Sequence, residues 1–160
     1  MKILIISDSH GNFTAIRKVL SMEKDAQMLI HCGDIEGDED LLTQTFKGGD
    51  VKIVSGNCDL FCVLESELMF TVCNKKFMVT HGHRYGVSMT PEVLLDEAIS
   101  RGADFVLYGH THRPTILYHQ QITGINPGSV TYPRQEGRMP TYAVMEIDEN
   151  GKADIEIRYL

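Results

Sequence analysis

The sequence predicts an α/β fold in which two β-sheets pack together and α-helices flank the resulting β-sandwich. Two observations support this prediction. Short apolar runs alternate with helical patterns in the first half of the chain, whereas the last third consists mostly of strand patterns. With 160 residues, 42% of them hydrophobic, the chain has the size and composition of one domain, which we place at residues 1–160.

The first half is expected to alternate strand and helix. Residues 3–6 form a continuous apolar run, which is typical of a strand buried on both faces. A helix with Asn12 as its N-cap should follow, because the next apolar residues recur at helical spacing. We then expect a strand at residues 28–30, a short helix at 40–46 and a strand at 51–54.

The second half is expected to hold one more helix among several strands. Thr90 and Pro91 suit the start of that helix, and Gly102 suits its end. Asn74-Lys75 and Asn150-Gly151 each predict the turn of a hairpin, the latter a two-residue turn. The expected strands are residues 68–73, 77–80, 105–108, 115–118, 121–125, 141–147 and 153–159.

Five apolar runs end in turns that carry Asp, Asn or His side chains. These turns are Asp8-Ser9-His10, His31-Cys32-Gly33-Asp34, Gly56-Asn57-Cys58-Asp59, His81-Gly82-His83 and Gly109-His110-Thr111-His112. Sites form at the carboxyl ends of sheet strands, so the side chains converge if these strands are neighbours. Grouped carboxylates repel one another unless a cation lies between them. Carboxylate, imidazole and amide ligands suit Mn, Fe, Ni, Co or Zn, which makes a metal site the prediction.

In this order, the five motifs resemble those of the calcineurin-like metallophosphoesterase superfamily. The segment Asn126-Pro127-Gly128-Ser129 is similar to the small prokaryotic phosphodiesterase branch, which is related to the retromer-subunit scaffold. The resemblance spans about residues 1–147 and implies a β-sandwich flanked by helices.

The resemblance also implies two divalent metal ions, with manganese favoured over nickel, iron and zinc. The implied ligands are Asp8, His10 and His112 for the first ion, Asn57, His81 and His110 for the second, and Asp34 as the bridge between them. The implied reaction is hydrolysis of a phosphodiester by in-line attack of a metal-bridging hydroxide. Asp34 would therefore be catalytic as well as metal-binding.

The group that protonates the leaving oxygen departs from the family pattern. Many relatives carry a histidine after Gly-Asn, and here that residue is Cys58. A thiol, with a pKa of about 8.5, is a poor substitute for an imidazolium with a pKa of about 6.5. We therefore expect either a preference for good leaving groups or a substitute acid, for which His83 is the candidate. Arg84 and Arg134 are expected to bind the substrate phosphate.

Charge and hydropathy limit the partners. The formal net charge is 15 − 22 = −7 and no dense Lys/Arg cluster is present, which argues against specific binding of duplex nucleic acid. No apolar run is long enough for a spanning helix or a signal peptide, so we expect a cytoplasmic protein without membrane partners. The expected partner is a small phosphodiester substrate. The sequence does not decide whether the protein also forms a homo-oligomer.

Two other functions compete with this prediction. A non-catalytic scaffold of the retromer-subunit type has no need for five strand ends that carry Asp, Asn and His. A phosphomonoesterase is disfavoured because the Gly-Asn-His sequence is absent. A dinucleotide-binding fold is disfavoured too, because no G-x-G-x-x-G motif follows a strand.

Overall fold

The computed structural model describes residues 1–37, 39–60 and 62–160. Every helix and strand expected from the sequence is found there, with shifts of a few residues at the ends. In chain order the elements are β1 (Lys2–Ile6), α1 (Phe13–Met22), β2 (Met28–His31), α2 (Glu39–Thr45), β3 (Asp50–Ile53), β4 (Glu67–Val72), β5 (Lys75–Thr80), the 3-10 helix η1 (His83–Tyr85), α3 (Glu92–Ser100), β6 (Phe105–Leu107), β7 (Pro114–His119), β8 (Ile122–Pro127), β9 (Thr141–Ile147) and β10 (Ala153–Tyr159).

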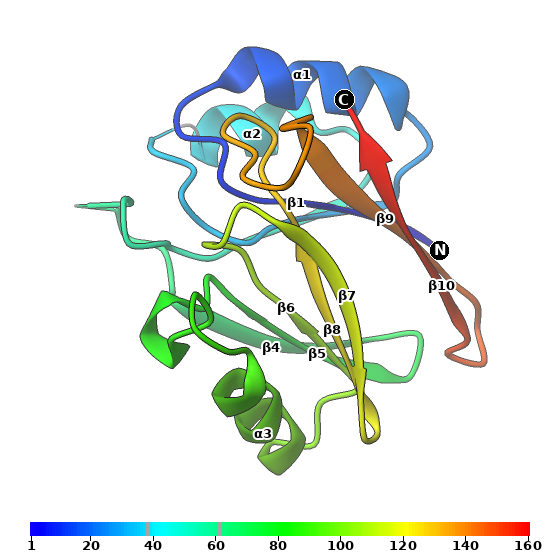
Figure 1. Cartoon of the computed structure of the whole chain (residues 1–160). Helices are drawn as coiled ribbons and strands as arrows, with labels where there is room; N and C mark the ends of the chain where they lie inside the picture. The colour runs from blue at the N-terminus through cyan, green and yellow to red at the C-terminus, as the bar shows by residue number, and fades with distance from the viewer. Residues whose placement is uncertain (38, 61) are drawn as a thin grey trace.

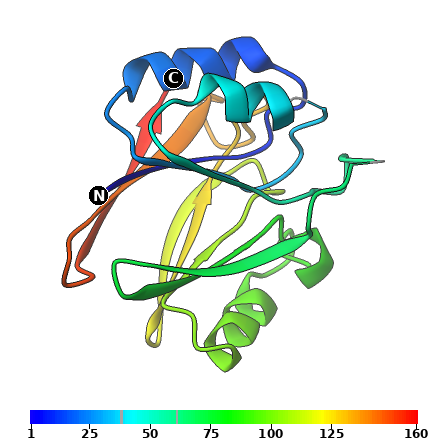
Figure 2. The ribbon, with the colours of Figure 1, turned by 180° about the vertical axis from the view of Figure 1, so that it is seen from behind.

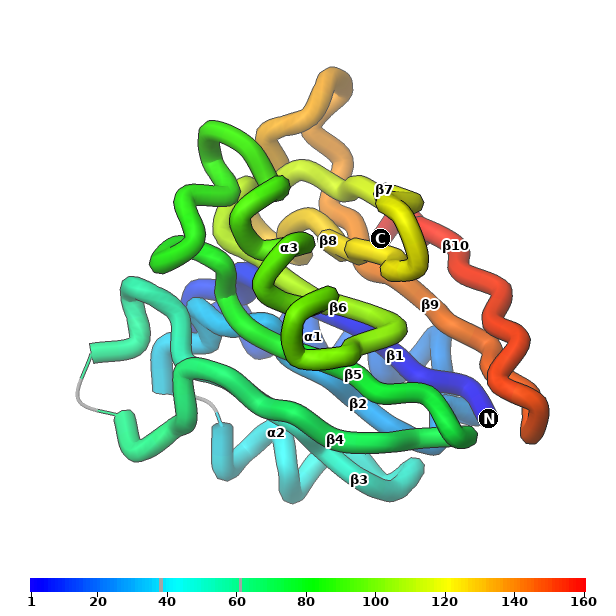
Figure 3. Tube along the Cα trace, turned by 90° about the horizontal axis from the view of Figure 1, so that it is seen from below, coloured from blue at the N-terminus to red at the C-terminus, as the bar shows by residue number. Residues whose placement is uncertain are grey.

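The strands form two five-stranded sheets, which confirms the predicted sandwich. The first sheet has the order β10-β9-β1-β2-β3, and the second has the order β4-β5-β6-β8-β7. Helices α1 and α2 cover the outer face of the first sheet, and α3 covers the outer face of the second (Figure 1). The reverse view shows the same layers (Figure 2), and from below α3 lies across the second sheet (Figure 3).

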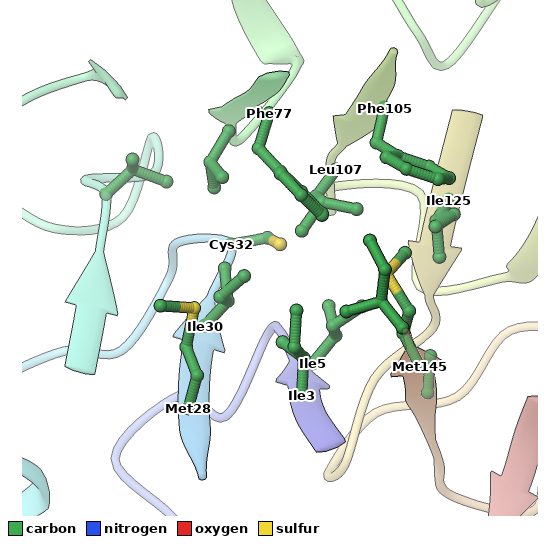
Figure 4. Close-up of a cluster of buried hydrophobic side chains, with 14 residues drawn as sticks. Ile3, Ile5, Met28, Ile30, Cys32, Phe77, Phe105, Leu107, Ile125 and Met145 are labelled. Atoms are coloured by element: carbon green, nitrogen blue, oxygen red, sulfur yellow. The ribbon is translucent and has the colours of Figure 1, made fainter. Parts of the chain in front are cut away.

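Alternation along the strands explains the layers. Ile3 and Ile5 of β1 point into the core between the sheets, whereas Leu4 and Ile6 pack under the helices of the first sheet. Figure 4 shows the inner side chains of both sheets facing one another. Full burial of each such aliphatic side chain stabilises the fold by about 1.5–3 kcal/mol. Within the described residues, no helix has the length and apolar character needed to cross a bilayer.

The helix ends agree with the sequence to within one residue. The Asn12 side chain accepts a hydrogen bond from the Ala15 amide at 3.1 Å, which confirms it as the N-cap of α1. Helix α3 begins at Glu92, so Pro91 is its N-cap and not its first helical residue. Its end is as predicted, because Gly102 follows in the left-handed region with φ +71°.

Both hairpin turns differ from the sequence prediction. The β4–β5 turn is formed by Cys73 and Asn74, both with positive φ, and lies one residue earlier than expected. The β9–β10 connection is a loop over residues 148–152, so the two-residue turn at Asn150-Gly151 was wrong. Its cause is the Asp148 side chain, which accepts hydrogen bonds from the amides of residues 150 and 152 and so stabilises the longer loop.

The five polar turns come from both sheets. Three follow β1, β2 and β3 of the first sheet, and two follow β5 and β6 of the second. The convergence predicted from the sequence is therefore not along the edge of one sheet. The carboxyl ends of these five strands meet at the left-hand side of Figure 1, which brings the turns together.

Candidate metal centre

Five of the implied ligands lie in left-handed backbone. They are Asp8 (φ 54°), His10 (φ 47°), Asp34 (φ 54°), His110 (φ 69°) and His112 (φ 56°). This conformation costs about 1–3 kcal/mol for a residue other than glycine, and it persists only where the surroundings enforce it. Its use at five positions of one site turns each strand end sharply and aims the side chains inward.

The first cluster joins two turns of different sheets. Ligand atoms of Asp8, His10 and His112 all lie within 4.8 Å of one another. His112 Nε2 is 3.1 Å from Asp8 Oδ1 and 3.3 Å from His10 Nε2. These three residues are the set that the resemblance implies for the first ion.

The second cluster shares a carboxylate with the first. Ligand atoms of Asp8, Asp34 and His81 also lie within 4.8 Å of one another. Asp34 Oδ2 is 3.3 Å from His81 Nε2 and 3.9 Å from His10 Nε2. Asp8 is therefore the carboxylate common to both clusters, and Asp34, a member of the second, also approaches His10 of the first.

The other two implied ligands differ in how firmly they belong to the site. The His110 ring lies 5.2 Å from the His81 ring, measured between centroids, and the His110 amide donates to Asp8 Oδ2 at 3.1 Å. Asn57 is exposed, and its amide nitrogen donates to Cys58 Sγ at 3.2 Å. Asn57 therefore lies beside the site, next in sequence to Cys58, whose amide donates to Asp34 Oδ1.

The residues present fit a pair of divalent metal ions. Asp8 Oδ1 and His81 Nε2 are buried and make no hydrogen bond of good geometry among the described residues, although His112 Nε2 lies 3.1 Å from Asp8 Oδ1 and Asp34 Oδ2 lies 3.3 Å from His81 Nε2. Buried polar atoms without a partner are costly, and like-charged carboxylates in one cluster repel each other. Divalent cations satisfy both demands, and carboxylate with imidazole is a donor set that they accept.

Hydrogen bonds outside the clusters fix the imidazoles. His81 Nδ1 lies 2.7 Å from the Cys32 carbonyl oxygen, and His112 Nδ1 lies 2.7 Å from the Tyr132 carbonyl oxygen. A carbonyl can only accept, so Nδ1 carries the proton and donates it. Nε2 of each neutral ring is then left with a free lone pair that faces the cluster, as a metal ligand requires.

Comparison with known proteins identifies the family. Residues 1–150 match the model of the calcineurin-like phosphoesterase superfamily domain. The chain belongs to the calcineurin-like phosphoesterase superfamily. It is 34% identical over 154 residues to the probable metallophosphoesterase YsnB of Bacillus subtilis, an alignment that covers 94% of this chain and 86% of YsnB. It is 28% identical over 171 residues to the phosphodiesterase YfcE of Escherichia coli K12, covering 92% and 89%.

Solved structures show the same fold. A predicted phosphoesterase from Streptococcus pneumoniae TIGR4 superposes with a TM-score of 0.81 at 26% identity, covering 98% of this chain and 97% of that one. Vps29 from Entamoeba histolytica, complexed with Zn²⁺, superposes with a TM-score of 0.76 at 20% identity, covering 99% of each chain. This phosphoesterase belongs to a metal-dependent family, and the two clusters are its candidate ligands.

Glycines allow the turns of this phosphoesterase to pack against the ligands. A Cβ on Gly56 would lie 2.1 Å from Asp34 Oδ1, and a Cβ on Gly109 would lie 2.7 Å from Asp8 Oδ2 and 2.0 Å from Ser7 Oγ. Contacts below 3.0 Å cannot form without displacement. Both glycines are therefore needed for close approach to a ligand carboxylate.

Asp59 is a structural residue of the site that the sequence did not single out. Its carboxylate accepts hydrogen bonds from the amides of Asp34 (2.8 Å), Glu36 (2.7 Å) and Gly56 (2.7 Å). Asp59 thereby joins the turn after β2 to the turn after β3. Its place after Gly-Asn-Cys gave a signal, because Asp in a turn commonly accepts from nearby backbone amides.

Asn126 and Ser129 anchor the backbone of two turns that carry implied ligands. Asn126 is fully buried and donates to the Gly109 carbonyl at 2.8 Å, and Ser129 Oγ donates to the Asp8 carbonyl at 2.8 Å. From the sequence, Ser129 stands out only as part of the segment that is similar to the small prokaryotic phosphodiesterase branch. The structure gives it a more specific role, because it anchors the backbone of a ligand residue.

His83 lies next to the second cluster. Its ring centroid is 5.4 Å from that of His81 and 6.1 Å from that of His110. Burial, and then the nearby His81 and His110, lower the pKa of His83. His83 Nδ1 is buried without a hydrogen-bond partner among the described residues. The side chain is therefore close enough to act beside the predicted metal ligands.

The two arginines predicted to bind substrate are placed differently. Arg84 is exposed, and its guanidinium donates to Ser66 Oγ at 3.1 Å. Arg134 is also exposed, but its amide donates to the His112 carbonyl at 2.9 Å, which fixes its backbone beside a ligand turn. Of the two, Arg134 is tied more directly to the candidate metal centre.

Protons compete with metal at this site. Burial lowers the pKa of His81, but the Asp34 and Asp8 carboxylates outweigh burial and raise it above its ordinary value. Burial likewise raises the pKa of Asp34, but His81 and the Cys58 amide outweigh it and hold this pKa well below its usual range. In the metal-free protein the charged pair thus favours His81⁺, whereas a metal ion requires neutral His81.

We expect the affinity for Mn²⁺ to fall as the pH is lowered through the raised pKa of His81. Protonated His81 stabilises the metal-free protein fully below the unfolded pKa, and this stabilisation is lost as pH rises through the folded pKa. Metal binding follows the opposite direction and should weaken about tenfold per pH unit below that pKa. Calorimetric titration at pH 8, 7 and 6 measures how the Mn²⁺ affinity depends on pH. An affinity that stays the same from pH 8 to pH 6 would contradict this prediction.

Proposed function

We propose that this phosphoesterase is a phosphodiesterase that depends on two divalent metal ions, with manganese favoured, and hydrolyses small phosphodiesters. The observation that carries the proposal is a pair of clusters that have Asp8 in common and that Asp34 also approaches, in which Asp8 Oδ1 and His81 Nε2 are buried without a hydrogen bond from the described residues. The name of the relative YfcE supports a diester over a monoester.

The residues that would hold the ions are those implied by the sequence. They are Asp8, His10 and His112 for one ion, Asn57, His81 and His110 for the other, and Asp34 for both. When bound, two such ions supply Lewis acidity at the phosphoryl oxygens and a hydroxide nucleophile at neutral pH. The chain contributes neutral imidazoles fixed by carbonyl groups and the Asp34 carboxylate, which the Cys58 amide holds and which would serve both ions.

The leaving oxygen still needs a proton. Partial desolvation and the adjacent Asp34 carboxylate raise the pKa of Cys58 to about 12, so its thiol is a poor acid. Asp59 offers no help to Cys58, because its carboxylate is engaged with three backbone amides. We propose His83 as the acid, since it lies beside His81 and His110 and its imidazolium form is a far stronger acid than the Cys58 thiol.

A leaving-group series tests the role of His83. We expect His83→Ala to slow hydrolysis of diphenyl phosphate about 100-fold but hydrolysis of bis(4-nitrophenyl) phosphate only about threefold, because nitrophenolate leaves without a proton. Cys58→Ser serves as the matched control and should change either rate by less than about twofold. An equal loss with both esters in His83→Ala would show that His83 is not the acid.

The function itself is tested by metal content and substrate class. The metals in the protein as purified would be measured first, and then hydrolysis of bis(4-nitrophenyl) phosphate and 4-nitrophenyl phosphate with Mn²⁺, Ni²⁺ or Zn²⁺ added. We expect the diester to react faster, with Mn²⁺ the best ion. Faster hydrolysis of the monoester would make the protein a phosphomonoesterase. No hydrolysis with any ion would favour the non-catalytic scaffold.

A further inference from the structure

A second polar site lies beside the candidate metal centre. It is a hollow of about 620 Å³, here called the arginine hollow, lined by Arg113, Thr131, Tyr132, Pro133, Arg134 and Arg138. Apart from Arg134, which the sequence predicts to bind the substrate phosphate, none of these side chains has a role in the mechanism proposed above. Three guanidinium groups in one hollow are unexpected on a chain with a formal net charge of −7 and only 15 Lys and Arg residues.

The guanidinium groups of the hollow have no carboxylate partner in the part of the chain that the structure describes. Within residues 1–37, 39–60 and 62–160, no carboxylate forms an ion pair with Arg113, Arg134 or Arg138. Arg113 Nε donates to the Arg134 carbonyl at 3.3 Å, which ties the Arg113 side chain to the backbone of its neighbour. The arginine hollow therefore carries positive charge that a bound anion could neutralise.

The arginine hollow is tied to the metal ligands through its own backbone. The Arg134 amide donates to the His112 carbonyl at 2.9 Å, and the Tyr132 carbonyl accepts from His112 Nδ1 at 2.7 Å. The Tyr132 ring lies 5.3 Å from the His10 ring, measured between centroids. Tyr132 thus borders both the hollow and the first cluster.

The segment that lines the arginine hollow is also hydrogen-bonded to the turn after β1. Thr131 Oγ1 donates to the Ser9 carbonyl at 2.9 Å, and Ser129 Oγ accepts from the amides of Thr131 and Tyr132. The same Ser129 hydroxyl donates to the Asp8 carbonyl. The segment that carries the hollow therefore has a fixed position relative to Asp8 and His112, as a subsite for one substrate requires.

We propose that the arginine hollow binds a second phosphoryl group of the substrate, so that the preferred phosphodiester carries another phosphate a few bonds away from the scissile one. Arginine binds phosphate oxygens in a bidentate manner. A phosphate monoester carries about −1.5 to −2 charges at pH 7, which suits three guanidinium groups better than a single carboxylate does. This inference rests on the proposed phosphodiesterase function and names its substrate class.

Two matched substrates test the proposal on the metal-loaded full chain. One is the 4-nitrophenyl ester of thymidine 5′-phosphate, and the other is the same ester with an added 3′-phosphate. We expect the 3′-phosphorylated ester to have a kcat/KM about tenfold higher or more, mainly through a lower KM. In the variant Arg113→Gln/Arg138→Gln this advantage should disappear. It should persist in Lys18→Gln/Lys24→Gln, which removes two charges from α1 and the turn after it.

A binding measurement separates this inference from the proposed function. Inorganic pyrophosphate would be titrated calorimetrically into the full chain after chelation of metal. We expect the dissociation constant to rise about tenfold or more in Arg113→Gln/Arg138→Gln and to change little in Lys18→Gln/Lys24→Gln. If no ester is hydrolysed yet this difference is found, the proposed function fails and the anion subsite stands. If both esters react equally well, or if the two double variants bind pyrophosphate alike, the arginine hollow is not a phosphate subsite.

Discussion

Replacing Asp34 by Asn is expected to lower kcat for bis(4-nitrophenyl) phosphate by about 1,000-fold. The substitution keeps the shape of the side chain and removes the charge that would serve both ions. The contact of Asp34 Oδ1 with the Cys58 amide can remain, because an Asn oxygen also accepts. Steady-state kinetics with saturating Mn²⁺, together with metal analysis of the purified variant, measure the effect.

Asp154→Asn is the matched control for this experiment. Asp154 is exposed on β10, far along the chain from every ligand turn, and the substitution removes the same charge. It should leave kcat within about twofold of the parent and the metal content unchanged, because surface changes usually alter free energies by less than about 0.5 kcal/mol. If Asp34→Asn kept more than a tenth of the parent kcat with a full metal complement, the bridging role of Asp34 would be wrong.

Gly56→Ala is expected to have the second largest effect. The added methyl group would lie 2.1 Å from Asp34 Oδ1 and 2.5 Å from the Asp34 amide, so the carboxylate or the turn has to move. We expect kcat/KM to fall about 100-fold, because displacement of a catalytic group by about 1 Å costs that much. The affinity for Mn²⁺ should fall as well. Circular dichroism checks that the fold is retained.

The control for Gly56→Ala separates the loss of a ligand position from a general loss of stability. Gly102 lies in the left-handed region with φ +71°, and an added methyl group there meets nothing within 4 Å. Gly102→Ala should therefore lower the free energy of unfolding by roughly 1–2 kcal/mol through its backbone alone. It should leave kcat/KM unchanged. An active Gly56→Ala protein with normal metal affinity would mean that the turn adapts around Asp34.

The elements of the fold were predictable because each has a local signature. The buried runs that became β1, β2, β5 and β6 are continuous and apolar, and the N-cap of α1 is set by one side chain, Asn12. The division of these strands between two sheets was harder to locate from the residues. Pairing between strands that are far apart in the sequence cannot be read from the local sequence of either strand.

The candidate site was predictable where residue type alone selects the chemistry. Asp8, His10, His81 and His112 meet as the motifs indicated, because carboxylate and imidazole groups at strand ends have few other uses in such numbers. The role of Asp59 was not predictable in the same way. A carboxylate that accepts from backbone amides in two separate turns depends on how those turns pack, and spacing does not record that.

The loops were the least predictable part. Asp148 accepts from two amides and so lengthens the β9–β10 connection beyond the tight turn that Asn150-Gly151 favours. Two local preferences competed there, and the side-chain hydrogen bonds prevailed over the turn propensity.

Because the implied ligands belong to different sheets, bound ions would also hold the two sheets of the sandwich together. Asp8 and Asp34 extend from one sheet, His81 and His112 extend from the other, and ions held among all four would resist separation of the two layers at that end. Chelation should then speed amide hydrogen exchange at the carboxyl ends of β2 and β5 more than in α3, which packs on the far side of the second sheet. On this view the cations secure the architecture in addition to enabling chemistry.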